Sequence, residues 1–200
     1  MSQLQPESSG PPGDSSRHLP LAELDAALRA LPAPPKDSGI LTLIVARRAD
    51  GVRETPQRVR LTPEAGVPGD RWARRPPLDA AAQLTVMRAD VARLIANGQP
   101  LTLFGDNLFV DLDISAANLP VGTRLRVGEA IVEVTANPHN GCGKFKQRFG
   151  ADALHFVNAP PTRDQNRRGI YWTVVQSGDV HAGASVRVLS RGGHDSNATV

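Results

Sequence analysis

The sequence has one cysteine, few aromatic residues and no long apolar run, and each of these shortages excludes a class of protein. A single cysteine, Cys142, rules out an intramolecular disulfide and is typical of a reducing compartment. No apolar run approaches the length of a membrane span, and the N-terminus lacks the basic and then apolar order of a secretory signal. We therefore expect a soluble, cytoplasmic protein with no membrane partner.

The charge balance gives little support to a nucleic-acid-binding function. Lys and Arg total 23 against 20 Asp and Glu, a formal net charge of +3 that would also suit a solubilising surface or an anionic ligand. The features that favour nucleic-acid binding, besides the net charge, are three arginine pairs: Arg47-Arg48, Arg74-Arg75 and Arg167-Arg168. Aromatic residues make up 4% of the chain and are not interleaved with these pairs, so few rings are placed to stack on nucleic-acid bases. Nucleic-acid binding ranks last among our hypotheses.

Abundant glycine and proline, 18 and 17 residues, favour a turn-rich β protein over a helical bundle. Strand-like segments separated by glycine-marked turns cover residues 40–46, 57–61, 83–87, 108–114, 123–127, 130–135, 170–175 and 185–189. The last two are expected to be joined by a turn around Ser177-Gly178-Asp179. About eight short strands predict a mainly β fold, a closed or nearly closed β-barrel with a few short helices. Those helices are expected at residues 90–97, with Asp90 as N-cap, and at residues 144–149.

The domain organisation follows from composition. Residues 1–19 are rich in Ser, Pro and Gly and are predicted to be disordered. Leucines at helical spacing in LAELDAALRAL, ended by Pro32, predict a short amphipathic helix, so residues 1–38 form a tail plus helix. This helix would pack on the main domain, or alternatively dock a partner. The barrel is expected over residues 39–190, and residues 191–200 are expected to fray.

The segment from Asn137 to Gly150, NPHNGCGKFKQRFG, is the strongest candidate for chemistry. Cys142 lies between two glycines, and a run of basic residues follows it, a setting that favours thiolate. A lone cysteine is more often an inert, buried, small apolar residue. This one lies in a Pro/Asn/Gly turn that ends a strand and opens a basic segment, which favours a functional role.

Six motifs occur in an order that resembles the MOSC domain, named for the C-terminal domain of molybdenum cofactor sulfurase. They are GVPGDRW, QLTVM, GDNLFVDLDI, LPVGTRLRVGEAIVEVT, the Cys142 segment and RRGIYWTVVQSGDVHAGASVRVL. The match runs from about Gly39 to Leu189. The resemblance implies a β-barrel whose characteristic cysteine, matched here by Cys142, carries sulfur as a persulfide or contacts the metal of molybdenum cofactor.

The resemblance also implies an anionic ligand, and soft thiolate suits the sulfur-rich coordination of molybdenum. The candidate cofactor-binding residues, which would hold the pterin phosphate or orient the pterin, are Asp70, Arg71, Asn107, Lys144, Arg167 and Arg168. Asp70 and Asn107 could equally serve only to close turns. Sulfur transfer or molybdenum-cofactor-dependent chemistry is expected. A cysteine desulfurase, on which we expect the pyridoxal phosphate, or a molybdoenzyme would be the protein partner.

Three positions depart from the family pattern. Gly141 stands where the family usually has proline, His139 stands near the usual arginine, and Ala184 replaces an acidic residue. We expect these changes to loosen the cysteine loop and to remove one charge. The alternative function is therefore a non-catalytic binding or adaptor module, with the leucine helix and the tail as its working parts.

Overall fold

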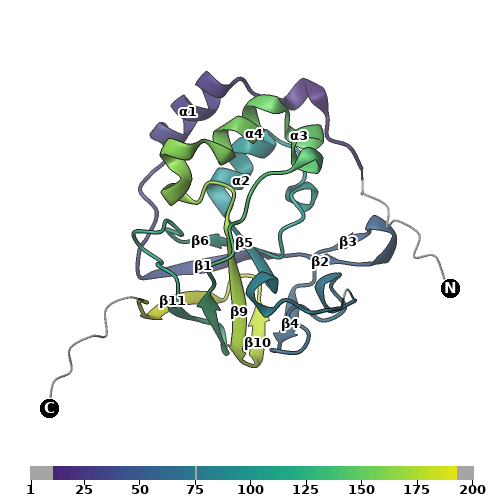
Figure 1. The fold of residues 1–200 in the computed structure, drawn as a ribbon, viewed down its shortest axis with the longest axis vertical. Helices are drawn as coiled ribbons and strands as arrows, with labels where there is room; N and C mark the ends of the chain where they lie inside the picture. The colour runs from purple at the N-terminus through teal and green to yellow at the C-terminus, as the bar shows by residue number, and fades with distance from the viewer. Residues whose placement is uncertain (1–10, 75, 193–200) are drawn as a thin grey trace, which may run out of the picture.

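The computed structural model describes residues 11–74 and 76–192, and it is built on a closed barrel of seven strands (Figure 1). In order around the barrel these are β1 (Ser38–Ile44), β11 (Ser185–Ser190), β7 (Arg124–Val127), β8 (Ala130–Val134), β9 (Ile170–Gln176), β5 (Leu84–Arg88) and β6 (Leu108–Asp111). β6 pairs with β1 to close the ring. All pairings are antiparallel except β5 with β6, whose crossover contains a helix. The predicted β-barrel is confirmed.

Two short strand pairs extend the barrel. β2 (Ala46–Arg47) pairs with β3 (Arg53–Glu54), and β4 (Arg58–Leu61) pairs with β10 (Gly178–His181). β10 replaces the predicted turn around Ser177-Gly178-Asp179, which was wrong. Gly178 lets the strand pass close to the β7–β8 turn, because a Cβ there would lie 2.2 Å from the carbonyl carbon of Glu129.

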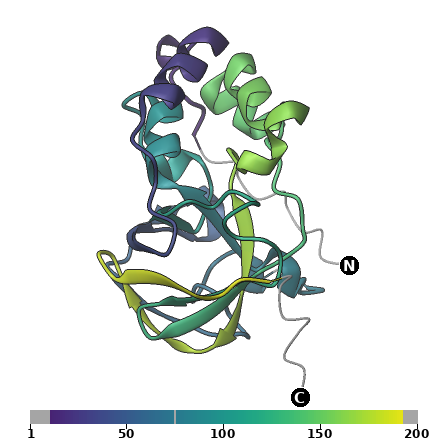
Figure 2. The ribbon, with the colours of Figure 1, turned by 90° about the vertical axis from the view of Figure 1, so that its left-hand side faces the viewer.

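The four α-helices lie together on one side of the barrel and are called here the helical layer (Figures 1 and 2). They are α1 (Leu21–Ala30), α2 (Ala89–Ala96), α3 (Gly143–Phe149) and α4 (Ala151–Asn158). Short 3-10 helices occupy connections: η1 (Ser15–Arg17), η2 (Ala49–Gly51), η3 (Trp72–Arg74), η4 (Ala80–Ala82), η5 (Leu101–Leu103) and η6 (Pro160–Gln165). No helix within the described residues is long and apolar enough to cross a membrane.

Two details of the helices differ from the predictions. α2 begins at Ala89, one residue before the predicted start, and Asp90 does not cap it but binds the Arg88 guanidinium at 2.6 and 2.8 Å. α4 was not predicted at all, although Ala153, Phe156 and Val157 are buried at helical spacing. Gly150, with φ of 95°, turns the chain between α3 and α4. The predicted helix at residues 144–149 is confirmed within α3.

Two hydrophobic cores follow from the alternation of side chains along the strands. Inward residues such as Leu125 and Val132 fill the barrel. A second core lies between the barrel wall and the helical layer, where Met87 and Phe109 meet the aromatic residues of α3 and α4. Leu24 of α1 is fully buried in this second core. The amphipathic helix therefore packs on the domain, as its first interpretation predicted.

The chain ends are more ordered than predicted where they are described. Residues 11–19 contain η1 rather than disordered chain, and they bond to the domain: the Asp14 N–H donates to the Gln99 side chain at 2.7 Å. Likewise, Arg191 does not fray, because its guanidinium bonds to Asp37 and Asn118. The predictions for residues 1–10 and 193–200 lie outside the described residues.

Candidate functional site

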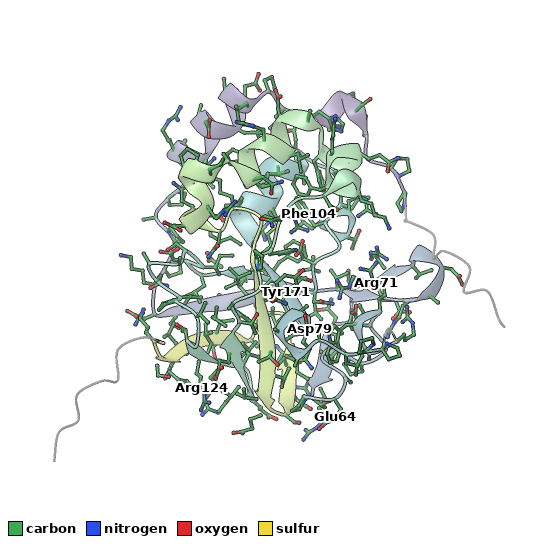
Figure 3. All side chains as sticks on the ribbon, viewed as in Figure 1. Glu64, Arg71, Asp79, Phe104, Arg124 and Tyr171 are labelled. Atoms are coloured by element: carbon green, nitrogen blue, oxygen red, sulfur yellow. The ribbon has the colours of Figure 1, made fainter. Side chains whose placement is uncertain are left out.

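A cavity of about 290 Å³ opens between the barrel and α3, and Cys142 is one of its lining residues. Four barrel segments meet there, because the end of β1 and the start of β6 lie beside the first halves of β5 and β9. Figure 3 labels three lining residues: Phe104 below the helical layer, Tyr171 on β9 and Arg71 on the side of β2 and β3. A second hollow of about 250 Å³ adjoins it and shares Arg47, Arg71, Thr85 and Tyr171.

Cys142 is exposed, so it is not the buried, inert residue that a lone cysteine most often is. Its backbone is extended, with φ of −123° and ψ of −178°, and it is the residue immediately before α3. Its carbonyl accepts the first bond of that helix from the Lys146 N–H. The polypeptide thus leaves the barrel, presents the thiol at the cavity and turns at once into the helical layer.

Six cationic side chains line the same cavity, and no carboxylate is among its described lining residues. They are Arg47, Arg53, Arg71, Lys144, Arg148 and Arg168. We call this hollow the cationic cavity. Burial lowers the pKa of the Arg53 guanidinium, and the charges of Arg148, Arg47 and Arg71 lower it further. This mutual repulsion is what an anion in the cavity would relieve.

Arg148 couples the cation set to the cysteine. It is buried, and its guanidinium donates to the Leu103 carbonyl at 2.7 Å. Burial lowers the pKa of Arg148, while the charge of Cys142 raises it. The thiol and this arginine are therefore close enough to interact electrostatically.

Asp70 lies behind the cavity and holds its wall together. The carboxylate is buried and accepts from the Arg47 guanidinium at 2.6 Å and from the N–H groups of Arg47 and Trp72 at 2.8 and 2.9 Å. Burial alone would raise the pKa of Asp70, but the hydrogen bonds and charge of Arg47 outweigh it and lower the pKa. Asp70 ties the loop after β4 to β2. It is not among the lining residues.

Asn107 plays a similar internal role. Its side-chain oxygen accepts from the N–H and hydroxyl of Thr85, and its amide donates to the Val45 carbonyl and to Asp70. This fully buried side chain thus links β5, the residue that follows β1 and the loop after β4. Asp70 and Asn107 therefore lie behind the cavity wall, and neither is among its lining residues.

A buried trio adjoins the cavity: Arg168, Asp106 and His139. Arg168 donates to Asp106 Oδ2 at 2.7 Å, while Asp106 Oδ1 has no hydrogen-bond partner and lies 3.7 Å from His139 Nε2. Burial lowers the pKa of His139 well below its usual value, and the nearby arginines Arg168 and Arg47 lower it further, so the imidazole is neutral. Burial raises the pKa of Asp106 against the opposing effect of Arg168.

The structure separates the two arginines of the Arg167-Arg168 pair. Arg168 lines the cationic cavity, whereas Arg167 bonds to Asp25 of α1 at 3.1 Å and lies over the Phe156 ring at 4.3 Å. Arg167 is not among the lining residues of the cationic cavity. Of the predicted cofactor-binding residues, Arg71, Lys144 and Arg168 are brought together with Cys142, and Arg167 is not.

The cysteine loop is also less loose than expected. Gly141, in place of the usual proline, donates to and accepts from the side chain of Asn158 at 2.8 and 3.1 Å. Ala184 is buried, and its carbonyl accepts from the Leu41 N–H at 2.9 Å, so it belongs to the barrel and not to the cavity lining.

The described residues contain no group of three or more His, Cys, Asp or Glu side chains placed to hold a metal ion. A metal at Cys142 would therefore have to bring most of its own ligands. An anionic group that carries both sulfur ligands and a phosphate meets this condition, because the cavity offers one thiol and several cations.

Fold and site together define a one-cysteine β-barrel with a cationic cavity, and the comparisons with known proteins agree with the barrel fold. The MOSC domain model matches residues 68–187. The chain therefore belongs to the MOSC domain family, which is associated with the C-terminal domain of molybdenum cofactor sulfurase.

Individual relatives give less functional information. The uncharacterized protein YflK of Bacillus subtilis (strain 168) is 32% identical over 89 residues, 44% of this chain and 38% of that protein. The chain thus spans less than half the length of this curated relative. The crystal structure of a hypothetical protein superposes with a TM-score of 0.55 at 21% identity, covering 79% of this chain and 70% of that one. The crystal structure of the YUAD protein from Bacillus subtilis superposes with a TM-score of 0.53 at 17% sequence identity, covering 76% of this chain and 95% of that one. These two likenesses concern the fold.

Several lining residues were missed as site residues by sequence reasoning. Arg47 was considered only as part of an arginine pair for nucleic acid, and Arg148 only as a neighbouring charge. Arg53 comes from a two-residue strand and lies in no quoted motif, and Tyr171 lies in the last quoted motif but was not singled out. The GDN motif was noted for its asparagine, whereas its Asp106 is the member that pairs with a lining arginine.

Proposed function

We propose that this protein binds molybdenum cofactor, or a related sulfur-bearing anionic ligand, in the cationic cavity, with Cys142 as sulfur carrier or metal-ligating thiolate. The observation that carries the proposal is the placement of the sole cysteine and six cationic side chains around one hollow. When bound, the cofactor would supply a molybdenum centre with sulfur-rich coordination and a terminal phosphate.

The chain's cations suit the phosphate end of such a ligand. Arg71, Lys144 and Arg148 line the cavity together with Cys142, and guanidinium groups bind phosphate in a bidentate manner. The orientation of Arg47 is fixed by Asp70. An anion would lower the repulsion that depresses the pKa of Arg53, so binding and charge relief act in the same direction.

The thiol suits the sulfur or metal end. In the carrier form of the proposal, the Cys142 thiolate attacks the outer sulfur of a donor persulfide, R–S–SH. A new Cys142 S–S bond forms, the donor S–S bond breaks, and R–S⁻ leaves while the terminal sulfur keeps its proton. In the ligand form, the same thiolate would serve as a soft sulfur ligand for molybdenum.

The neighbouring groups would shape the pocket around that sulfur. Phe104 and Phe145 give it an apolar wall, and His139 Nδ1 and Asp106 Oδ1, which make no hydrogen bond, offer hydrogen-bonding capacity. Pyridoxal phosphate is proposed on a partner desulfurase and not on this chain. The adaptor alternative counts the leucine helix among its working parts, and α1 packs into the second core.

The test is the molybdenum and released pterin content of protein purified from a host that makes the cofactor. We expect cofactor in the parent, loss of most of it in Cys142→Ser and in Arg148→Gln, and parental content in the matched control Arg124→Gln, whose arginine bonds to Glu133 on the far barrel surface. Cofactor that is absent from the parent, or retained in both cavity variants, would overturn the proposal.

A further inference from the structure

The Cys142 loop is held from α4 by a single side chain, Asn158. Asn158 is the last residue of α4, and its amide oxygen accepts from the Gly141 N–H at 2.8 Å while its NH₂ donates to the Gly141 carbonyl at 3.1 Å. One side chain thus satisfies both backbone polar groups of the residue that precedes the cysteine. An amide side chain offers a donor and an acceptor side by side, on two different atoms.

Gly141 fits this contact because it has no side chain. A Cβ on Gly141 would lie 2.7 Å from Leu154 Cδ1 and 3.1 Å from Val157 Cγ2. A side chain at this position would require Leu154 and Val157 to shift. The glycine and the asparagine therefore form one contact, which we call the Asn158 clamp.

The clamp closes a unit that contains the cysteine. α3 begins directly after Cys142, Gly150 reverses the chain, and α4 returns it to Asn158 beside Gly141. Upstream, the described chain between Thr135 and Cys142 has no regular secondary structure. Its Asn137 makes an exposed bond to Asp79, and the buried side chain of its His139 contacts the Tyr171 ring and lies 3.7 Å from Asp106. The clamp acts on Gly141, the residue next to the cysteine.

We propose that Asn158 is a positioning residue that holds the Cys142 sulfur within the cationic cavity through Gly141. The inference rests on the proposed function only in taking Cys142 as the group that meets the ligand. Without the clamp, the loop would move away from α4, and the thiol would spend less time beside the arginines. The fold would remain, because the clamp's two bonds belong to no strand or helix.

A ratio of two alkylation rates tests this directly. Iodoacetate is an anion and iodoacetamide is neutral, and both react with the thiolate, so their rate ratio cancels the thiolate fraction and reports the local electrostatic field. Because Cys142 is the sole cysteine, every label is on the right residue. We expect the parent ratio to exceed that of a cysteine peptide by about tenfold at low salt, as for anions steered into a cationic cleft.

Asn158→Leu, which removes both bonds, should lower the ratio at least threefold towards the peptide value. Asn158→Asp keeps the acceptor for the Gly141 N–H, so its rate ratio should lie between that of Asn158→Leu and that of the parent. The control Asn137→Ala removes one bond from the same segment and should leave the ratio unchanged. Urea unfolding of each variant shows whether the fold is intact, and the aspartate variant serves if the leucine variant does not fold.

The outcomes separate the two proposals. A parental ratio in folded Asn158→Leu and Asn158→Asp would overturn the positioning role, whatever ligand the cavity takes. A parent whose ratio already equals that of the peptide would overturn the cationic setting of the sulfur, and with it both proposals. If the rate ratio falls in the Asn158 variants but the parent carries no cofactor, the positioning role of Asn158 stands and only the proposed ligand is refuted.

Discussion

Replacing Asp70 with asparagine should cost more stability than the loss of one charge on the surface would. The carboxylate is buried and accepts from three Arg47 donors, from the Trp72 N–H and from the Asn107 amide. Asp70→Asn keeps the shape but leaves the Arg47 guanidinium buried without its counter-charge. Removing one partner of a buried ion pair costs about 3–5 kcal/mol. For a chain of this size the melting temperature should fall by roughly 6–20 °C.

The assay is urea unfolding of the parent and Asp70→Asn, beside Asp179→Asn as control. Asp179 pairs with Arg60 at 3.3 Å on the surface, where such pairs contribute about 0–1 kcal/mol. The pKa of Asp70 is lowered in the fold, so its contribution is complete above the unfolded value of 3.8 and disappears as pH falls through the folded value. If the free energy of unfolding fell by less than about 1 kcal/mol at pH 7, Asp70 would not be the buried counter-charge on which this part of the fold depends.

Two further predictions concern the surroundings of the cavity. The pKa of His139 is lowered mainly by burial, so as pH falls the imidazole is protonated in the unfolded chain before it is protonated in the fold. The free energy of unfolding should therefore decrease below pH 6.5, by about 1.4 kcal/mol per pH unit. Urea unfolding from pH 7.5 to 5 should show this slope to be weaker in His139→Gln, and an equal slope would contradict it. Phe104→Ala removes a ring that stacks on Phe149 at 4.2 Å and should cost about 3–5 kcal/mol in the same assay, against about 0.5 for the exposed control Val121→Ala. A loss near the control value would contradict the packing role.

The barrel could be predicted from the sequence because alternation and glycine-marked turns are local signals. β10 could not, because its strand conformation depends on pairing with β4, more than a hundred residues away. α4 was missed although its pattern was present: its eight residues follow a glycine break directly after α3. β10 was missed because its strand conformation depends on tertiary pairing. α4 was missed because a second helix after the Gly150 break was not expected.

The candidate site was predictable only where a motif or a neighbouring residue pointed to it. Cys142 and Lys144 share one segment, so their meeting in the cavity followed from their spacing. Neighbours in the chain, by contrast, diverge in the fold. Arg47 turns inward to Asp70, while Arg48 turns outward to Glu54.

The same divergence explains why Arg167 is not among the residues that line the cationic cavity. Arg168 enters the cavity, and its neighbour binds α1. A run of two arginines therefore predicts at most one lining residue. Which of the two lines the cavity is settled by the register of the backbone, and that depends on contacts far away in the sequence.

The most direct test of the central claim is the rate at which iodoacetamide labels Cys142 in cofactor-loaded protein and in the same protein after the cofactor is removed. If the ligand occupies the cationic cavity at the thiol, loading should slow labelling at least tenfold, and stripping should restore it. Equal rates in the two forms, or a protein that cannot be loaded at all, would contradict the claim that Cys142 and the cationic cavity form one site.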